Sequence, residues 1–521
     1  MAYLAHKDRF QTIFTSLEEP IDKDNPVRFI DAFVDTIDLS QLCFIVSEIK
    51  MEVRPAYHPK TFLKLYFYGY LNGIRSSRRL ERECVRNIEL QWLLSGLVPN
   101  YHSIADFRKI NPLALKATFK LFVLFLKDLD LIGGEVVAID GTKIRASNSK
   151  KNNYSPKKIE RHLAYIEAKT EEYLKELEQN DVSEKPIEQI NNVQEKIDRL
   201  KINKLKYDTL QKQLEKTKEP QVSTTDPDAK ALLVQGQVVE VSYNQQAAVD
   251  QKHNLVIGTH TINRNDRNAL SEIAIEAKKN IESEGFTALV DKGYHNGKEI
   301  QTTQTNGIIT VVAIPEIANS NAKRTSRAYM VDEFIYHKES DTYTCPQGEI
   351  LSTKGTWHTK KKDENTSYQF KKYRTPKCKE CPVRHLCTAK ADGSREIERS
   401  EYAEAVAINK VNYLNNKDSY RKRQEINEHI FGTIKRQWGF KKDIHVMKCS
   451  KKAQIDLVFM KSGIKKQVTE FEEGAYFCKK CKKSIMVENM RILPQYGHNL
   501  MLWSVNQKIQ YKLSTESIIN Y

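Results

Sequence analysis

The sequence predicts an α/β protein in which a mixed sheet is flanked by helices and preceded by an all-α domain. Two apolar runs, Glu135–Thr142 and Thr287–His295, have the composition of strands, and in each the strand reaches an aspartate next to a glycine turn. Segments with helical spacing lie between and after these runs, which favours helices on both faces of one sheet. A chain of 521 residues is long enough for about two to four domains.

The composition favours a polyanionic partner. Lys and Arg number 83 against 67 Asp and Glu, a net charge of +16. Nucleic acid is the commonest partner of such a chain, although ribosome-associated and membrane-surface proteins share the excess. The most apolar window, residues 121–132, is too short and too charged to span a membrane, and the N-terminus lacks the apolar core of a signal peptide. We therefore expect a cytoplasmic, nucleoid-associated protein with no membrane partner.

Residues 1–130 have mainly helical spacing and are predicted to form a DNA-binding domain. A serine cap leads into an arginine-rich helix that includes Arg75, Arg78 and Arg79. A second capped start follows at Ser103. Short helices joined by tight turns, one of them basic, are typical of helix-turn-helix-like domains. A helical packing or dimerisation domain with a solvated basic face is the alternative.

The sheet is predicted to begin in residues 131–315. Strand patterns recur at residues 238–249, 254–262 and 308–314, with a helix at 268–282. Residues 156–218 change to a Glu/Lys/Leu/Ile composition with helical spacing, broken near Asn180 and Pro186. This segment is predicted to be a helical hairpin inserted between strands, forming a solvated or partner-binding arm.

Residues 316–417 are predicted to be a cysteine-rich insertion. Four of the nine cysteines lie there: Cys345, Cys378, Cys381 and Cys387. In a chain without a secretory signal, a Cys-x2-Cys pair flanked by two further cysteines is the ligand set of a tetrahedral structural zinc. Unligated thiols in a small packed subdomain are the alternative. Cys478 and Cys481 form a second close pair in the tail 467–521, which remains unassigned.

Residues 418–466 are predicted to carry the last helix of the core, which ends at Gly439. At about 100° per residue, its apolar side chains fall on one side. These are Ile426, Ile430, Phe431, Ile434 and Trp438. A second side holds Glu428 among the polar residues Arg421, Gln424 and Lys435. A basic surface helix with a chance acid is the alternative.

Together, Asp140, Asp291 and Glu428 suggest a metal site. Either aspartate alone is more readily explained as a turn or cap residue. Three carboxylates at one end of a sheet repel one another unless divalent cations lie between them. Hard oxygen ligands suit Mg²⁺ or Mn²⁺, which activate attacking and leaving oxygens in phosphodiester exchange.

The chain resembles the bacterial insertion-sequence transposases of the DDE class, whose catalytic core is ribonuclease-H-like. The resemblance spans roughly residues 25–458. It is carried by several motifs in the right order: YHPKTFLKLYFYGYLNGIRSSRRLE, SIADFRK, AIDGTKIRASNSK, DKGYHNGKE and RKRQEINEHIFGTIKRQWGF. Relatives also carry a cysteine-rich insertion.

The resemblance implies metal-dependent cleavage at the ends of the element, then attack of a freed 3′-hydroxyl on target DNA. Asp140, Asp291 and Glu428 would be the metal-binding triad. Tyr420, Arg423 and Lys435 match the polar residues around the acid of relatives, although Arg423 lies five residues before Glu428 where many relatives have four.

Helical geometry makes Arg421 and Lys435 the better-placed phosphate contacts. Lys143, Arg145 and Lys292 are expected to neutralise further phosphates. We expect a homodimer acting on DNA. An inactive DNA-binding copy that acts as a repressor, and a nuclease of the same fold, are the alternatives.

Overall fold

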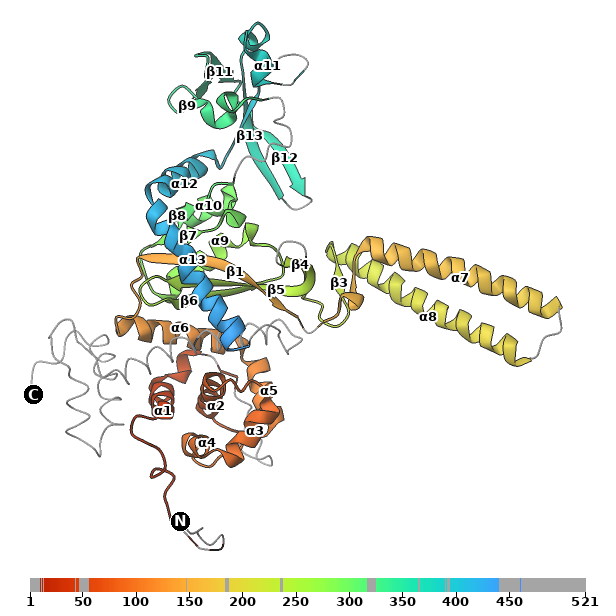
Figure 1. The fold of residues 1–521 in the computed structure, drawn as a ribbon, viewed down its shortest axis with the longest axis vertical. Coiled ribbons are helices and arrows are strands. Elements are labelled where there is room, and N and C mark those ends of the chain that lie inside the picture. Colours follow the sequence, from red (N-terminus) through yellow and green to blue (C-terminus); the bar gives the residue numbers. More distant parts are fainter. Residues whose placement is uncertain are drawn as a thin grey trace, which may run out of the picture.

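The computed structural model of the chain has a helical N-terminal region, a sheet flanked by helices, a projecting helical arm and a second sheet (Figure 1). It describes residues 10–439 and residue 460, apart from residues 11, 13, 43, 46–55, 147, 183–186, 235–237, 316–324, 364–365, 389 and 391–393. The predictions for residues 467–521, including Cys478 and Cys481, lie outside this range.

The N-terminal region is helical, as predicted. Its helices are α1 (Pro26–Thr36), α2 (Pro59–Leu71), α3 (Ser77–Arg86), α4 (Ile88–Leu93), α5 (Tyr101–Ile110) and α6 (Pro112–Asp128). Their apolar faces share one continuous core with the first sheet. Helix α6 lies between the other helices and the sheet and packs on β6 (Leu255–Ile262) (Figure 1). The N-terminal helices are therefore packed onto the sheet by a shared apolar core.

The first sheet is mixed, with strands in the order β4-β5-β1-β7-β8 and β6 also paired with β5. Its other strands are β4 (Lys230–Val234), β5 (Val238–Asp250), β1 (Val136–Arg145), β7 (Thr287–Val290) and β8 (Ile309–Val312). Strand β1 is central: it runs antiparallel to β5 and parallel to β7. The register pairs Ile139 with Val290. Asp140 and Asp291, the next residue after each, therefore lie at equivalent positions on the two neighbouring strands.

One detail of β1 differs from the prediction. We expected the strand to stop at the Asp140–Gly141 turn, but it continues to Arg145 because Gly141 pairs with Gln246 of β5. A glycine is needed at position 141 because there is no room for a side chain, not because the chain turns there. A Cβ atom at this position would lie 2.3 Å from Gln246 Nε2 and 2.4 Å from Asp266 Oδ1.

Helices lie on both faces of the sheet. Helix α13 (Lys417–Gly432) crosses β1, β5 and β7 and is followed by a π-helical turn, Thr433–Gln437. Helix α9 (Leu270–Asn280) packs on β6, β5 and β1. Helices α10 (Gly297–Thr305) and α12 (Ala403–Asn415) cover β8. The predicted apolar side of the last helix is confirmed, since Ile426, Ile430 and Ile434 are buried.

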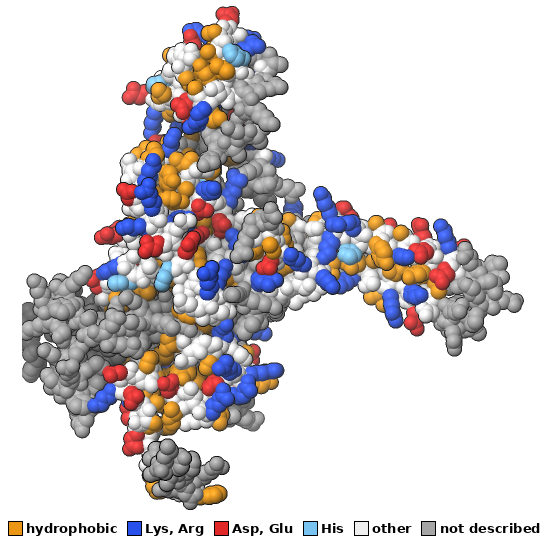
Figure 2. Space-filling model, in the orientation of Figure 1, with side chains coloured by type: hydrophobic (Ala, Val, Ile, Leu, Met, Phe, Trp, Pro, Cys, Tyr) orange, Lys and Arg blue, Asp and Glu red, His pale blue; other side chains and the backbone are white. Residues whose placement is uncertain are grey.

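The predicted helical hairpin is also present. Helices α7 (Pro156–Val182) and α8 (Ile187–Thr217) form an arm that projects away from the sheets (Figure 1). The short strands β2 (Asn153–Tyr154) and β3 (Val222–Ser223) pair at its base, where a small separate core forms. On the face shown in Figure 2, basic and acidic side chains are interspersed along the arm.

A second sheet occupies most of residues 335–400. Its strands are β9 (Ile335–His337), β10 (Thr342–Thr344), β11 (Ile350–Thr353), β12 (His358–Asp363), β13 (Thr366–Arg374) and β14 (Ile397–Ser400). Its small core includes Phe334, Tyr343 and Tyr373, with Cys345 and Cys387 packed against it. Among the described residues, no helix is long and apolar enough to cross a membrane.

Candidate functional site

Asp140 and Asp291 come together at the centre of the first sheet, and both contact one arginine. Arg423 of α13 places Nη1 3.2 Å from Asp140 Oδ2 and Nη2 3.8 Å from Asp291 Oδ1. Its side chain is only 9% exposed, against 30% and 42% for the two aspartates. The backbone N–H of Gly141 also donates to Asp140 Oδ1 at 2.8 Å. One guanidinium therefore neutralises a pair of partly exposed carboxylates.

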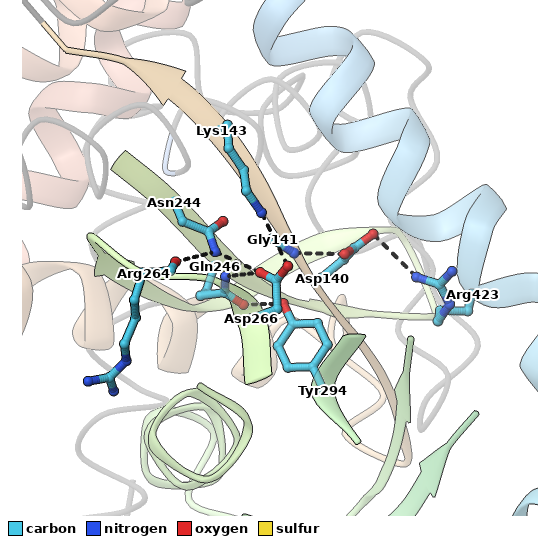
Figure 3. A network of polar contacts seen from close by, with 9 residues as sticks. All are labelled: Asp140, Gly141, Lys143, Asn244, Gln246, Arg264, Asp266, Tyr294 and Arg423. Atoms are coloured by element: carbon cyan, nitrogen blue, oxygen red, sulfur yellow. Dashed lines mark hydrogen bonds and ion pairs between the residues drawn. The ribbon is translucent and has the colours of Figure 1, made fainter. Parts of the chain in front are cut away.

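A third aspartate, Asp266, lies near Asp140 (Figure 3) and is not among the predicted site residues. It belongs to the short turn before α9, and its Oδ1 accepts hydrogen bonds from the Asn244 and Gln246 amides at 2.7 and 2.8 Å. Its Oδ2 is 3.2 Å from the Lys143 ammonium. The hydroxyl of buried Tyr294 donates to Gln246 Oε1. A run of polar residues inside an otherwise apolar strand, 244–246, was the available signal.

Burial and charge set the protonation of these groups in opposite directions. Burial raises the pKa of Asp140; Arg423 and the Gly141 N–H oppose this, while Asp266 and Asp291 add to it. Burial also acts to raise the pKa of Asp266, but Lys143 and the two amides outweigh it and hold that pKa below its usual value. Asp266 is thus held as a carboxylate, whereas Asp140 depends on its neighbouring cation.

Glu428 does not join the two aspartates in this arrangement. It is exposed, whereas Arg423 and Asn427 are the polar residues of α13 that are buried. Both polar side-chain atoms of Asn427 are buried without a hydrogen-bond partner. Helical spacing predicted that Arg421 would lie on the same side of the helix as Glu428 and contact phosphates. The arginine that contacts Asp140 and Asp291 is instead the buried Arg423. Arg421 is 81% exposed and lies 3.7 Å from Asp418.

In this arrangement the two aspartates supply only part of the ligand set of a divalent ion. Within the part of the chain that the structure describes, no three His, Cys, Asp or Glu side chains are grouped so that they could hold a metal. Asp140 and Asp291 supply hard oxygen atoms of the right kind, but the Arg423 guanidinium lies against both.

The remaining predicted phosphate contacts are distributed unevenly. Lys143 lies in the network with Asp266. The pKa of Lys435 is lowered mainly by burial and further by the nearby charge of Lys143. Arg145 is exposed and pairs with Glu240 at 2.9 Å. Lys292, next to Asp291, is exposed. Lys143 and Lys435 therefore form the cationic side of the site.

The arginines of α3 lie on the surface of the N-terminal helices. Arg78 and Arg79 are exposed; Arg78 stacks over the Tyr101 ring at 5.0 Å, and Arg79 lies 3.7 Å from Glu83. Arg75, two residues before α3, donates to the Trp438 carbonyl at 3.5 Å, so the turn that leads into α3 touches the end of the segment that follows α13.

The four cysteines of the insertion gather around one end of the second sheet without forming a metal-binding group among the described residues. Burial raises the pKa of the Cys387 thiol; nearby Arg395 opposes this, and the Cys378, Cys345 and Cys381 thiols reinforce it. Cys387 is therefore within electrostatic range of the other three thiols, but the described residues do not show the predicted tetrahedral zinc geometry.

Comparisons with known proteins give two family matches. The model described as "Transposase domain (DUF772)" matches residues 15–110, and the model described as "Transposase DDE domain" matches residues 344–468. The first match covers the helices up to α5, and the second covers the second sheet from β11 onwards together with α12 and α13. No curated protein and no solved structure matches the chain.

Proposed function

Because this chain is a DDE transposase of the insertion-sequence kind, an enzyme of metal-dependent DNA cleavage and strand transfer, we propose that both reactions take place at Asp140 and Asp291. The observation that carries the proposal is the single guanidinium shared by the two carboxylates, 3.2 and 3.8 Å away. Neutralising two partly exposed acids with one buried arginine is expected to add little to stability, because the cost of burying the charge offsets the attraction. Such clusters are typical of functional sites.

We propose that the core is ribonuclease-H-like. In support, three antiparallel strands, β6, β5 and β1, continue into the parallel strands β7 and β8, with acids at adjacent positions of β1 and β7. We propose the domains 1–130, 131–315 with the arm 156–218, 316–417 and 418–466, with a change to the boundary at residue 417.

Helix α12 packs on β8 and α10, so we propose that the core resumes by residue 403 rather than at residue 418.

We propose Mg²⁺ or Mn²⁺ as the ion, since the two acids offer only hard oxygen ligands. Glu428 remains the proposed third acid. For the cysteines, a structural zinc remains a proposal, supported by the electrostatic proximity of Cys387 to three other thiols.

DNA is the substrate of a transposase, and we propose where it contacts this chain. Near the acids, Lys143, Arg145, Lys292, Arg423 and Lys435 are proposed to face phosphates, as is Arg421 at the exposed end of α13. Arg78 and Arg79 of α3, with Arg75 just before this helix, are proposed to bind the element ends. A homodimer is proposed, because transposition joins two ends.

The test is cleavage of duplex DNA that carries the element's terminal repeats, with Mg²⁺ or Mn²⁺, by Asp140→Asn, Asp291→Asn and Glu428→Gln. Each should lose roughly a hundredfold or more in rate, since several kcal/mol of transition-state stabilisation are removed. End binding, measured by gel shift, should stay within about threefold, because base and backbone contacts lie elsewhere.

Glu425→Gln is the matched control, because Glu425 is an exposed acid on the same helix. It should cleave at the wild-type rate. Full cleavage by Asp140→Asn or Asp291→Asn would remove that residue from the site. Full cleavage by Glu428→Gln would leave the enzyme with a different third ligand.

A further inference from the structure

We propose that Asp266 is a positioning residue that holds Lys143 beside the two acids so that its ammonium meets a phosphate of the DNA strand being cut. The proposal rests on the proposed function of Asp140 and Asp291. Nothing in the family matches assigns a role to Asp266, which lies outside both matched segments.

The carboxylate of Asp266 is held by three donors at once. Asn244 and Gln246 contact Oδ1 at 2.7 and 2.8 Å, and Lys143 contacts Oδ2 at 3.2 Å. Asn244 and Gln246 are fully buried and pair in the sheet with Lys143 and Gly141, respectively. Rigid neighbours therefore fix the carboxylate, and the carboxylate fixes the flexible lysine side chain.

The same network ties the two acid-bearing segments together. Gly141 follows Asp140, and its missing side chain leaves the space that Asp266 and Gln246 occupy. Tyr294, three residues after Asp291, donates from its hydroxyl to Gln246 (Figure 3). Asp266 thus lies between the segment that carries Asp140 and the segment that carries Asp291.

The negative charge of Asp266 is the property that distinguishes a positioning role from a merely structural one. A neutral polar residue would suffice to bridge two amides, but it would leave the ammonium of Lys143, whose side chain is only 17% exposed, without this counter-charge. Because the Lys143 ammonium is already oriented before DNA arrives, little side-chain entropy is lost when a phosphate binds it.

The experiment is a double-mutant cycle on DNA cleavage with Asp266→Asn, Lys143→Met and the double variant. Asn has one NH₂ in place of an acceptor, so it cannot accept from all three donors. We expect Asp266→Asn to lower kcat by roughly ten- to a hundredfold with the DNA KM within about twofold, because a misplaced group affects the transition state more than binding. Lys143→Met should lower kcat and raise KM.

Two features separate positioning from structure. The double variant should be no slower than Lys143→Met, because Asp266 acts through Lys143. In DNA binding followed by fluorescence anisotropy, the salt slope should fall by about one in Lys143→Met and stay unchanged in Asp266→Asn. Asp266→Glu, which keeps the charge, should recover part of kcat.

Asp226→Asn is the matched control: Asp226 is a fully buried carboxylate that accepts from the Tyr243 hydroxyl at 2.8 Å. It should lower the melting temperature and leave kcat unchanged. Additive losses in the double variant, or an equal kcat loss in Asp226→Asn, would overturn the proposal. The salt slopes are read without cleavage, so they test the Lys143 contact even if Asp140→Asn were to cleave normally.

Discussion

At the scale of single residues, Arg423 decides the charge state of the site. Its guanidinium contacts both acids, and although burial acts to lower its pKa, Asp140 and Asp291 help to raise it. For Asp140 the balance is different, since burial raises its pKa and the arginine only limits that rise. Removing the arginine should therefore protonate the acid, not merely weaken a contact.

We predict that Arg423→Met moves the acid limb of the pH–rate profile for DNA cleavage to higher pH by about one to three pH units. Without the guanidinium, more Asp140 is protonated at neutral pH, so activity falls there and recovers as the pH rises. The measurement is kcat/KM between about pH 5.5 and 9.5. Arg421→Met is the control, because this exposed residue contacts Asp418 rather than the acids. A profile that is lower but not displaced would contradict the prediction.

The sequence could predict the two aspartates but not the residues that surround them. Each aspartate follows an apolar strand, and this local pattern is visible in the chain. Asp266 follows a strand too, but it is 126 residues from Asp140 and 25 from Asp291 in the sequence (266 − 140 and 291 − 266), and only the sheet register brings the three together. Arg423 was noticed only through the resemblance, because helical spacing favoured Arg421.

At the scale of elements, periodicity identified the buried side of α13 but not how that side meets the sheet. Ile426, Ile430 and Ile434 are buried, as their spacing predicts. Arg423 and Asn427 are buried on the flank of this apolar side, whereas Glu428 falls beyond it. The two flanks of an amphipathic helix are equivalent in the sequence, so only tertiary packing decides which flank faces the acids.

The cysteine insertion allows a prediction about its metal content. We predict about one zinc per chain in freshly purified protein, measured by atomic emission, and a loss of that zinc in Cys378→Ser/Cys381→Ser. Burial, and then the neighbouring cysteines, raise the pKa of Cys387, and a bound zinc ion would favour the deprotonated form instead. Cys84→Ser is the control, since this buried thiol lies in the N-terminal helices. Zinc-free protein with four thiols reactive in the insertion would show that these cysteines serve packing alone.

At the scale of the whole molecule, one continuous core joins the N-terminal helices to the first sheet, while the arm and the second sheet have cores of their own. Both the arm and the second sheet lie in segments whose composition differs from that of their surroundings, in charge for the arm and in cysteine content for the sheet. The sequence could not reveal that α6 and α12 pack on the sheet as part of its core, since those contacts depend on the complete topology.

The separate core of the arm leads to a prediction about stability. Tyr154 pairs with Val222 in the short ladder at the base of the arm, so an Asn-Gly turn replacing residues 156–220 can close it as a two-residue hairpin. With Tyr154 and Val222 also changed to Thr, the main unfolding transition should stay within about 3 °C of wild type in calorimetry, because the deleted helices contribute nothing to the main core. Ile197→Asp is the matched control: it buries a charge only inside the arm and should leave the main transition in place. A fall of about 10 °C or more in either protein would mean that the arm and the sheet unfold as one cooperative unit despite their separate cores.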